Sequence, residues 1–267
     1  MESMSWKTEM VERALSYPYD VPREAYVLID GRVSGLGADG RVLAPDWVAG
    51  DGVGETLAEL LAVTGEPLHE RIPVLGYGSN AAPSQLRRKF ADAGPGCVIP
   101  VLKARLRGFD VVYSAHVSVY GAIPATLCPR PGTTVDGVVT LLSPSQAETM
   151  LRTEGGNYSV EAVDSRIIES AFVFEFQNPP QVYVSKYGGL AFEGQPVALS
   201  AVPASGRSLA ELSEGQMLER VVAELEPSLS VEAFIVECNR SEDARIRWVE
   251  RLGQWALSCH DHDLVGP

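Results

Sequence analysis

Cysteine, histidine and basic residues are all scarce in this sequence, and each shortage excludes a class of site. The 267 residues include four cysteines that form no Cys-x-x-Cys pair: Cys97, Cys128, Cys238 and Cys259. That spacing excludes both a zinc framework and a disulfide scaffold. The first three lie among Val, Ile, Leu and Phe, where a reduced cysteine behaves as a small apolar side chain. We therefore expect free thiols.

Positive charge and long apolar runs are also in short supply. The chain has 22 basic and 35 acidic residues, a net charge of −13, which argues against a nucleic-acid surface. No apolar run of about 18 residues occurs, and residues 1–9 lack the basic-then-apolar pattern of a signal peptide. Since 45% of the residues are hydrophobic, the chain can bury a core. We expect a cytoplasmic globular protein that binds a small molecule, with neither nucleic acid nor a membrane as partner; a homodimer stays open.

The four histidines leave few options for a Ser-His or Cys-His catalytic pair. His69 and His116 are isolated in the sequence, and the other two fall in the run His260–Asp263 near the C-terminus. That run is interpreted as a mobile polar end that binds a metal only adventitiously, because chain ends fray unless they are anchored. We expect no metal site.

Hydrophobic periodicity predicts strands through the middle of the chain and helices toward its end. Helices are predicted over residues 6–16, 53–63, 144–153, 209–225 and 243–257. Strands are predicted over residues 25–29, 41–44, 72–76, 97–102, 109–113, 135–142, 158–163, 166–176, 181–185 and 232–236. The helix at Pro144 has the clearest start, since Ser143 suits the N-cap and Gln146 completes a capping box. Gly155 and Gly156 end it.

One turn stands out, where the apolar run Val74–Gly76 breaks into Tyr77–Asn80 just before a predicted helix. Glycines let a backbone approach a ligand closely, and unpaired N–H groups at such a turn suit an anionic group. Gly76–Ala81 also matches the dinucleotide pattern G-x-G-x-x-A, but the acid expected about 20 residues later is missing. Ser79 is not set in Gly-x-Ser-x-Gly, so its hydroxyl is expected to bind rather than attack.

Charged residues near this turn offer two further candidates. A basic island falls within 21 residues that hold one acid, Asp92: Arg87, Arg88, Lys89, Lys103, Arg105 and Arg107. It either attracts an anionic substrate or forms a solvated surface. Glu154 lies at the negative end of the predicted helix, where a carboxylate is disfavoured unless it has a function such as proton transfer. A surface glutamate before a helix-ending Gly-Gly is the alternative.

Three motifs, in order, resemble the γ-glutamylcyclotransferase-like proteins: Tyr77–Asn80, Asp136–Leu142 and Thr153–Tyr158. The resemblance covers roughly residues 70–190 and implies an α+β fold, a mixed β-barrel with flanking helices. It also implies that Tyr77, Gly78, Ser79 and Asn80 form the pocket for a γ-glutamyl group and that Glu154 transfers the proton. Tyr158 is a candidate for closing the pocket, with a structural aromatic as the alternative. The chain departs from the family at Ala81, where leucine is frequent.

The expected activity is therefore cleavage of a γ-glutamyl amide by its own α-amine, giving 5-oxoproline and a free amine without a cofactor. Attack by an external amine or water in the same fold is the first alternative, and a non-catalytic binding module is the second. We divide the chain into an N-terminal extension (1–66), a cyclotransferase-like core (67–205) and a C-terminal helical section packed on the core (206–267). One of the two end sections is expected to border the pocket and narrow the choice of substrate.

Overall fold

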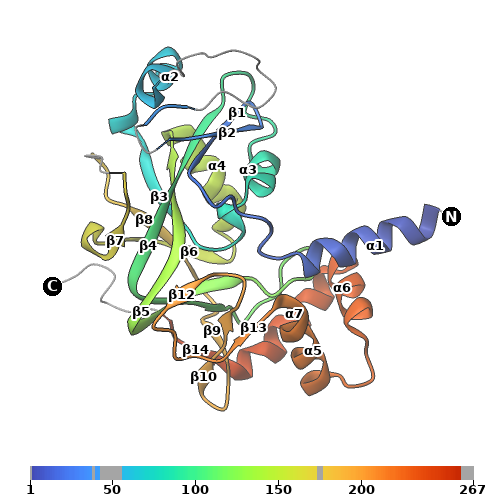
Figure 1. The fold of residues 1–267 in the computed structure, drawn as a ribbon. Helices are drawn as coiled ribbons and strands as arrows, with labels where there is room; N and C mark the ends of the chain where they lie inside the picture. The colour runs from blue at the N-terminus through green and yellow to red at the C-terminus, as the bar shows by residue number, and fades with distance from the viewer. Residues whose placement is uncertain (1, 38–39, 43–55, 173–176, 260–267) are drawn as a thin grey trace.

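The computed structural model of the chain describes residues 2–37, 40–42, 56–172 and 177–259 (Figure 1). Its centre is an 11-stranded mixed sheet. The strands of this sheet are β1 (Tyr26–Ile29), β2 (Arg32–Gly35), β3 (Ile72–Gly76), β4 (Val98–Tyr113), β5 (Ala125–Leu142), β6 (Tyr158–Ala162), β7 (Ile168–Glu169), β8 (Gln181–Ser185), β11 (Ala198–Leu199), β12 (Ala204–Ser205) and β13 (Glu211–Leu212). A second, 3-stranded sheet contains β9 (Gly189–Phe192), β10 (Gln195–Pro196) and β14 (Ala256–Leu257).

The large sheet follows the order β13-β11-β4-β5-β3-β8-β6. Most neighbours are antiparallel, while β3 with β8 and β11 with β13 are parallel. The expected α+β class is confirmed. The expected barrel is not: in the part of the chain that the structure describes, the two end strands of this order do not pair with each other, so the sheet is open.

Strands β4 and β5 are longer than the sequence predicted. The runs 97–102 and 109–113 join into one strand, β4, with a register irregularity between Arg107 and Phe109. The run 135–142 is only the second half of β5. Pro129, Pro131 and Gly132 hid the first half, because proline and glycine normally mark turns or strand edges.

The prediction of a return strand at 41–44 is wrong for residues 41 and 42, which the structure describes. The partner of β1 is β2, which follows directly across Asp30-Gly31. Both turn residues have positive φ, 47° and 75°, the backbone that a two-residue hairpin requires. Arg41 and Val42 form only single bridges to Thr56 and Leu36, and residues 43–44 lie outside the described ranges.

The helices are α1 (Glu2–Leu15), α2 (Leu57–Val63), α3 (Pro83–Lys89), α4 (Pro144–Glu154), α5 (Glu214–Leu225), α6 (Val231–Arg240) and α7 (Glu242–Leu252). Short 3₁₀ turns occur at Leu68–Glu70, Ser79–Ala81, Ser165–Ile167 and Gly253–Trp255. The predicted start of α4 is confirmed, with the full Ser143–Gln146 capping box. None of the helices in the described ranges combines the length and apolar character needed to cross a membrane.

The strand predicted at 232–236 is wrong, because this stretch lies in α6. Ser230 caps that helix by accepting a hydrogen bond from the N–H of Ala233 at 3.1 Å. Phe234, Ile235 and Cys238 are buried at helical spacing. A short apolar run fits either structure, so periodicity alone could not decide. Of the strand predicted at 166–176, the structure shows β7, with residues 173–176 outside the described ranges.

Apart from α2, which lies by itself near β1 and β2, the helices form two groups beside the sheet (Figure 1). One group, α3 and α4, packs Leu86 and Met150 into a cluster that includes Val74 of β3 and Val138 of β5. The other places α1 beside α5 and α6, with α7 against α6. Residues 1–66 contribute β1 and β2 to the main sheet. The division of the chain at 66/67 and 205/206 stays a prediction.

Candidate functional site

The end of β3 and the end of α4 meet at a cavity of about 420 Å³. Every site residue predicted from the sequence is on its wall: Tyr77, Gly78, Ser79, Asn80, Glu154 and Tyr158. The turn 77–80 follows β3, whereas Glu154 is the last residue of α4, and Tyr158 begins β6. The fold therefore brings together residues that lie more than 70 positions apart in the sequence.

The turn presents unused backbone donors. Among the described residues, none accepts a hydrogen bond from the backbone N–H of Gly78, Ser79 or Asn80. The carbonyl oxygens of Gly78 and Ser79, by contrast, accept from Ala81 and Ala82 at 3.0 Å and close the 3₁₀ turn. Three successive unpaired N–H groups can bind an anionic oxygen.

Asn80 offers an acceptor at the same turn. Its Oδ1 is buried and has no hydrogen-bond partner among the described residues. A buried polar atom without a partner costs roughly 1–3 kcal/mol. Because Asn80 lines the cavity, a ligand N–H group that reaches Oδ1 would remove this cost.

A glycine is needed at position 78 because the side chain of Tyr17 lies against it. A Cβ added at residue 78 would lie 2.7 Å from Oη of Tyr17, closer than a Cβ atom normally comes to another heavy atom. Tyr17 is itself fixed, since its Oη accepts a hydrogen bond from the N–H of Ala125 at 2.8 Å. The turn therefore packs directly on the segment that follows α1.

We expect Gly78→Ala to destabilise the protein by about 1–3 kcal/mol, the usual cost of forcing extra atoms into a packed site. In a Tyr17→Phe background, which lacks the clashing hydroxyl, the same substitution should cost less. Urea unfolding of the two single variants and the double variant measures this coupling. Strictly additive costs would contradict the packing described for Gly78.

Glu154 is not an exposed surface glutamate. Its side chain is 17% exposed and forms an ion pair with Lys89, the last residue of α3, which is 7% exposed. Nζ of Lys89 also contacts Sδ of Met150 at 3.6 Å. The negative end of α4 is therefore offset by an ammonium group, which the sequence argument did not foresee.

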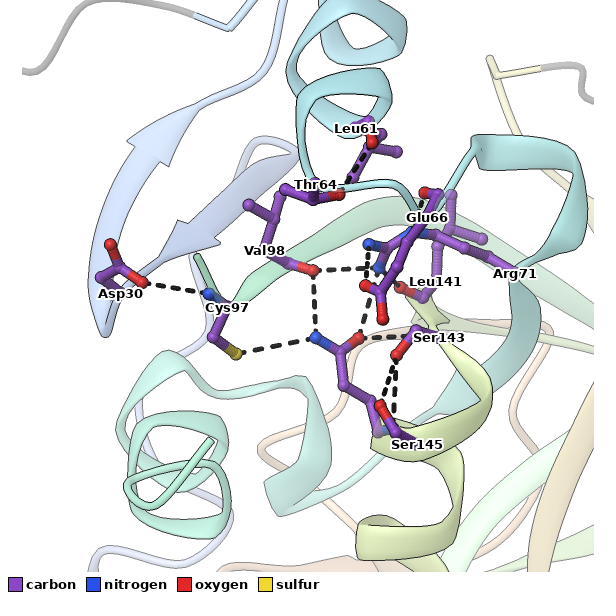
Figure 2. Close-up of polar contacts among 11 residues, drawn as sticks. Asp30, Leu61, Thr64, Glu66, Arg71, Cys97, Val98, Leu141, Ser143 and Ser145 are labelled. Carbon is purple, nitrogen blue, oxygen red and sulfur yellow. Dashed lines mark hydrogen bonds and ion pairs between the residues drawn. The ribbon is translucent and has the colours of Figure 1, made fainter. Parts of the chain in front are cut away.

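A buried network fixes the other end of α4 (Figure 2). Arg71, 1% exposed, donates from Nη1 to the carbonyl oxygens of Val98 and Leu141, each at 2.9 Å. The same Nη1 contacts Oε1 of Gln146 at 3.3 Å, the atom that accepts from the N–H of Ser143 in the capping box. These hydrogen bonds tie the start of α4 to β4 and β5. They thereby hold in place the helix that ends at Glu154.

Aromatic residues form much of the cavity wall. The hydroxyl of Tyr158 donates to the carbonyl oxygen of Ala125 at 3.0 Å, and that of Tyr77 donates to the carbonyl oxygen of Tyr183. Burial raises the pKa of Tyr77 and Tyr158, and it raises the pKa of Tyr183 to about 12. All three stay neutral phenols near pH 7. Tyr158 therefore offers the cavity its ring, while its hydroxyl bonds to the main chain.

The basic island is divided by the fold. Arg88 and Lys89 line the cavity. Arg87 instead donates to the carbonyl oxygen of Gly31 at 2.7 Å, and Lys103 lies 3.4 Å from that of Pro22. Arg105 and Arg107 are paired with acids on the sheet, Asp136 and Glu169. The attraction of an anionic substrate stays a prediction, and only Arg88 and Lys89 lie where they could provide it.

Several wall residues were missed because they come from segments outside the three motifs: Tyr17, His116, Ser118 and Tyr120. Three of them belong to the connection between β4 and β5, which has no periodic pattern. Tyr17 meets the expectation that an end section borders the pocket. Its effect on substrate choice stays a prediction. The other expectation for an end section, the run 260–263, lies outside the described residues.

The C-terminal section supports the wall through Glu214. This residue is 2% exposed, and its Oε1 accepts from the N–H of Ile123 at 2.7 Å, while Oε2 has no partner among the described residues. Burial raises the pKa of Glu214 well above its ordinary value of 4.5. The folded protein therefore holds this carboxyl group in its neutral form at a pH where the unfolded chain ionises it.

The sign of the resulting pH dependence follows from linkage. The stability that Glu214 contributes is complete below about pH 4.5 and is lost as the pH rises toward the raised folded pKa. We expect Glu214→Gln, which keeps the shape without the charge, to raise the melting temperature at pH 8 and to leave it unchanged at pH 4. Melting curves of both proteins across pH 4–8 measure this. Parallel pH profiles would rule the effect out.

Comparisons with known proteins add solved structures only. No protein-family model matches the sequence, and no curated protein matches it. One similar structure is named gamma-glutamyl cyclotransferase (TM-score 0.36, 16% identity, covering 74% of this chain and 94% of that one). Others are an uncharacterized protein from Homo sapiens (0.34, 14%, 74% and 95%) and a protein from Arabidopsis thaliana (0.31, 18%, 44% and 70%). The family that the three motifs resemble is thus represented among these structures. With TM-scores below 0.5, these likenesses carry no argument about function.

Proposed function

We propose that the protein is a γ-glutamylcyclotransferase-like enzyme that converts a γ-glutamyl amide into 5-oxoproline and a free amine. The observation that carries the proposal is the shared cavity: residues 78–80, whose N–H groups have no partner among the described residues, and Glu154 line one space of about 420 Å³. A site of this size suits a small ligand. The two parts have the properties that an internal acyl transfer needs, a charge-stabilising turn and a proton carrier.

The reaction forms one bond and breaks one. The α-amine of the γ-glutamyl group attacks its own γ-carbonyl carbon, which closes a five-membered ring and places negative charge on the carbonyl oxygen. The ring keeps the carbonyl, and the original C–N amide bond breaks to release the amine. Because nucleophile and electrophile belong to one molecule, holding the substrate in the right conformation supplies much of the rate. The chemistry requires no cofactor.

Glu154 is proposed to move the proton. An α-amine with an ordinary pKa of about 8 is mostly protonated at pH 7, so it must lose a proton before it can attack. That first proton goes to the solvent. As the new C–N bond forms, Glu154 accepts the second proton from the attacking nitrogen and delivers it to the departing nitrogen, which leaves as a neutral amine. Lys89 forms an ion pair with this carboxylate.

The turn is proposed to bind the rest of the glutamyl group. The N–H groups of Gly78, Ser79 and Asn80 stabilise the oxyanion, a role worth roughly 2.7–4 kcal/mol per donor in other enzymes. Asn80 Oδ1 accepts from the substrate amine, which gives this buried atom a partner. Arg88, whose Nη2 contacts Oε1 of Gln85 at 2.5 Å, supplies a cation at the cavity for the α-carboxylate.

Substrates with a blocked amine test the internal attack. The protein is incubated with a panel of γ-glutamyl amides and with the same compounds carrying an N-acetyl group on the α-nitrogen. The proposal expects amine release only from the unblocked set, since acetylation removes the nucleophile. Equal release from both sets would replace cyclisation by attack of water or an external amine. No release from either set, together with retained binding, would indicate a binding module.

A further inference from the structure

A chain of buried hydrogen bonds ends at His116 on the cavity wall. His116 lies between β4 and β5 and is 1% exposed. Its ring stacks on Tyr187, with centroids 4.8 Å apart, and meets Tyr158 edge-on at 5.6 Å. The imidazole is therefore held rigidly in a site that the sequence motifs did not include.

The direction of the hydrogen bonds fixes the position of the imidazole proton. The N–H of Tyr187 donates to Oγ of Ser185 at 3.1 Å, so Ser185 is an acceptor there. Ser185 Oγ lies 2.6 Å from Oγ of Ser114, which lies 2.7 Å from Nδ1 of His116. Within this chain of hydrogen bonds, both hydroxyl protons have an acceptor only if Ser185 donates to Ser114 and Ser114 donates to Nδ1. Nδ1 is then an acceptor, and the ring proton is on Nε2.

Nε2 of His116 has no hydrogen-bond partner among the described residues, and the residue lines the cavity. Burial lowers the pKa of His116 to about 3, so the ring stays neutral across the physiological range. The cavity thus holds an uncharged N–H donor, in addition to the backbone donors of residues 78–80. A neutral donor in a water-poor site strengthens as charge develops on the oxygen it binds.

We propose that Nε2–H of His116 donates a hydrogen bond to an oxygen of the acyl group bound in the cavity, and that Ser114 positions this donor. The inference rests on the proposed function for the identity of the acyl group. It adds to the turn a second oxygen-binding element from a different segment of the chain. Ser114 acts through His116, because it selects the ring form that has its proton on Nε2.

Two substitutions at the same position separate donation from packing. His116→Phe keeps a ring for the Tyr187 and Tyr158 contacts but has no donor, whereas His116→Gln carries an amide N–H at about the reach of Nε2. Neither variant keeps Nδ1, the acceptor that Ser114 uses, and only His116→Gln keeps an N–H donor. We expect His116→Phe to lower kcat/KM about 10²–10³-fold and His116→Gln to restore at least tenfold of that loss. Equal losses with unchanged melting temperatures would overturn the inference.

Nuclear magnetic resonance of the ¹⁵N-histidine-labelled protein tests the same point without turnover. In the free wild-type protein, His116 should show a protonated Nε2 and an unprotonated Nδ1. Ser114→Ala should change the proportion of molecules in this ring form. Addition of 5-oxoproline should shift the Nε2–H signal. A shift in a protein that makes no 5-oxoproline would support the binding role while contradicting the proposed reaction. An unmoved Nε2–H signal overturns the inference.

Discussion

Glu154→Gln is expected to slow the release of 5-oxoproline by about 10²–10⁴-fold, the usual contribution of a positioned acid–base group. The amide has nearly the shape of the carboxylate, so the cavity wall is retained, but it cannot accept a proton from an amine. The loss should fall on kcat rather than on KM, since the proton moves during the reaction and not during binding. Steady-state kinetics with one γ-glutamyl amide measure both constants.

A matched control addresses the ion pair. Lys89→Met removes the ammonium partner of Glu154 and leaves the carboxylate in place. If Glu154 acts chemically, Glu154→Gln should lose far more activity than Lys89→Met. Equal losses would mean that the ion pair matters only for the shape of the site. A Glu154→Gln protein as fast as the wild type would remove the proton-transfer role altogether.

Asp110→Ala is expected to lower the free energy of unfolding by about 3–5 kcal/mol, the cost of breaking a buried ion pair from one side. Asp110 lies in β4 and is fully buried, and Arg207 contacts it through Nε at 3.0 Å and Nη2 at 2.8 Å. Arg207 is 9% exposed and also holds Glu211 at 2.6 Å. Without Asp110, its charge would stay largely out of water, with the exposed Glu211 as its remaining charged partner and the carbonyl oxygen of Val202 as a hydrogen-bond acceptor.

The paired substitution shows whether charge is the cause. Asp110→Ala with Arg207→Met removes both charges, so the double variant should be more stable than the sum of the single losses predicts. Urea unfolding of the four proteins gives the coupling free energy. A coupling within about 0.3–0.5 kcal/mol of zero would show that the two residues act independently. The ion pair also ties the segment before α5 to the sheet. Helix α5 begins with Glu214, which accepts a hydrogen bond from the N–H of Ile123.

Local signals predicted the elements that carry the candidate site. The capping box at Ser143 gave the start of α4, and the apolar run before Tyr77 gave β3 and the turn. Such features depend on neighbouring residues, which sequence patterns describe well. The sequence-based argument for Glu154 was incomplete, because it used the end of α4 and could not include Lys89 of α3.

Features that depend on distant contacts were missed. Lys89 meets Glu154, and Ser114, the partner of His116, meets Ser185, only after the sheet has formed. The strand expected at 232–236 failed for a related reason, since a short apolar run becomes helical or extended according to what it packs against. The expected barrel came from the family resemblance and was not a property of any local pattern. The cytoplasmic location and the possible homodimer stay predictions.

Cyclisation in water labelled with ¹⁸O tests the central claim most directly. The purified protein is incubated with a γ-glutamyl amide in H₂¹⁸O, and the acyl product is identified by mass spectrometry. If the turn 77–80 and Glu154 form a cyclotransferase site, the product is 5-oxoproline with no ¹⁸O, because no water oxygen enters the γ-carbonyl group. Free glutamate with one ¹⁸O atom would show that water is the nucleophile and would contradict the account.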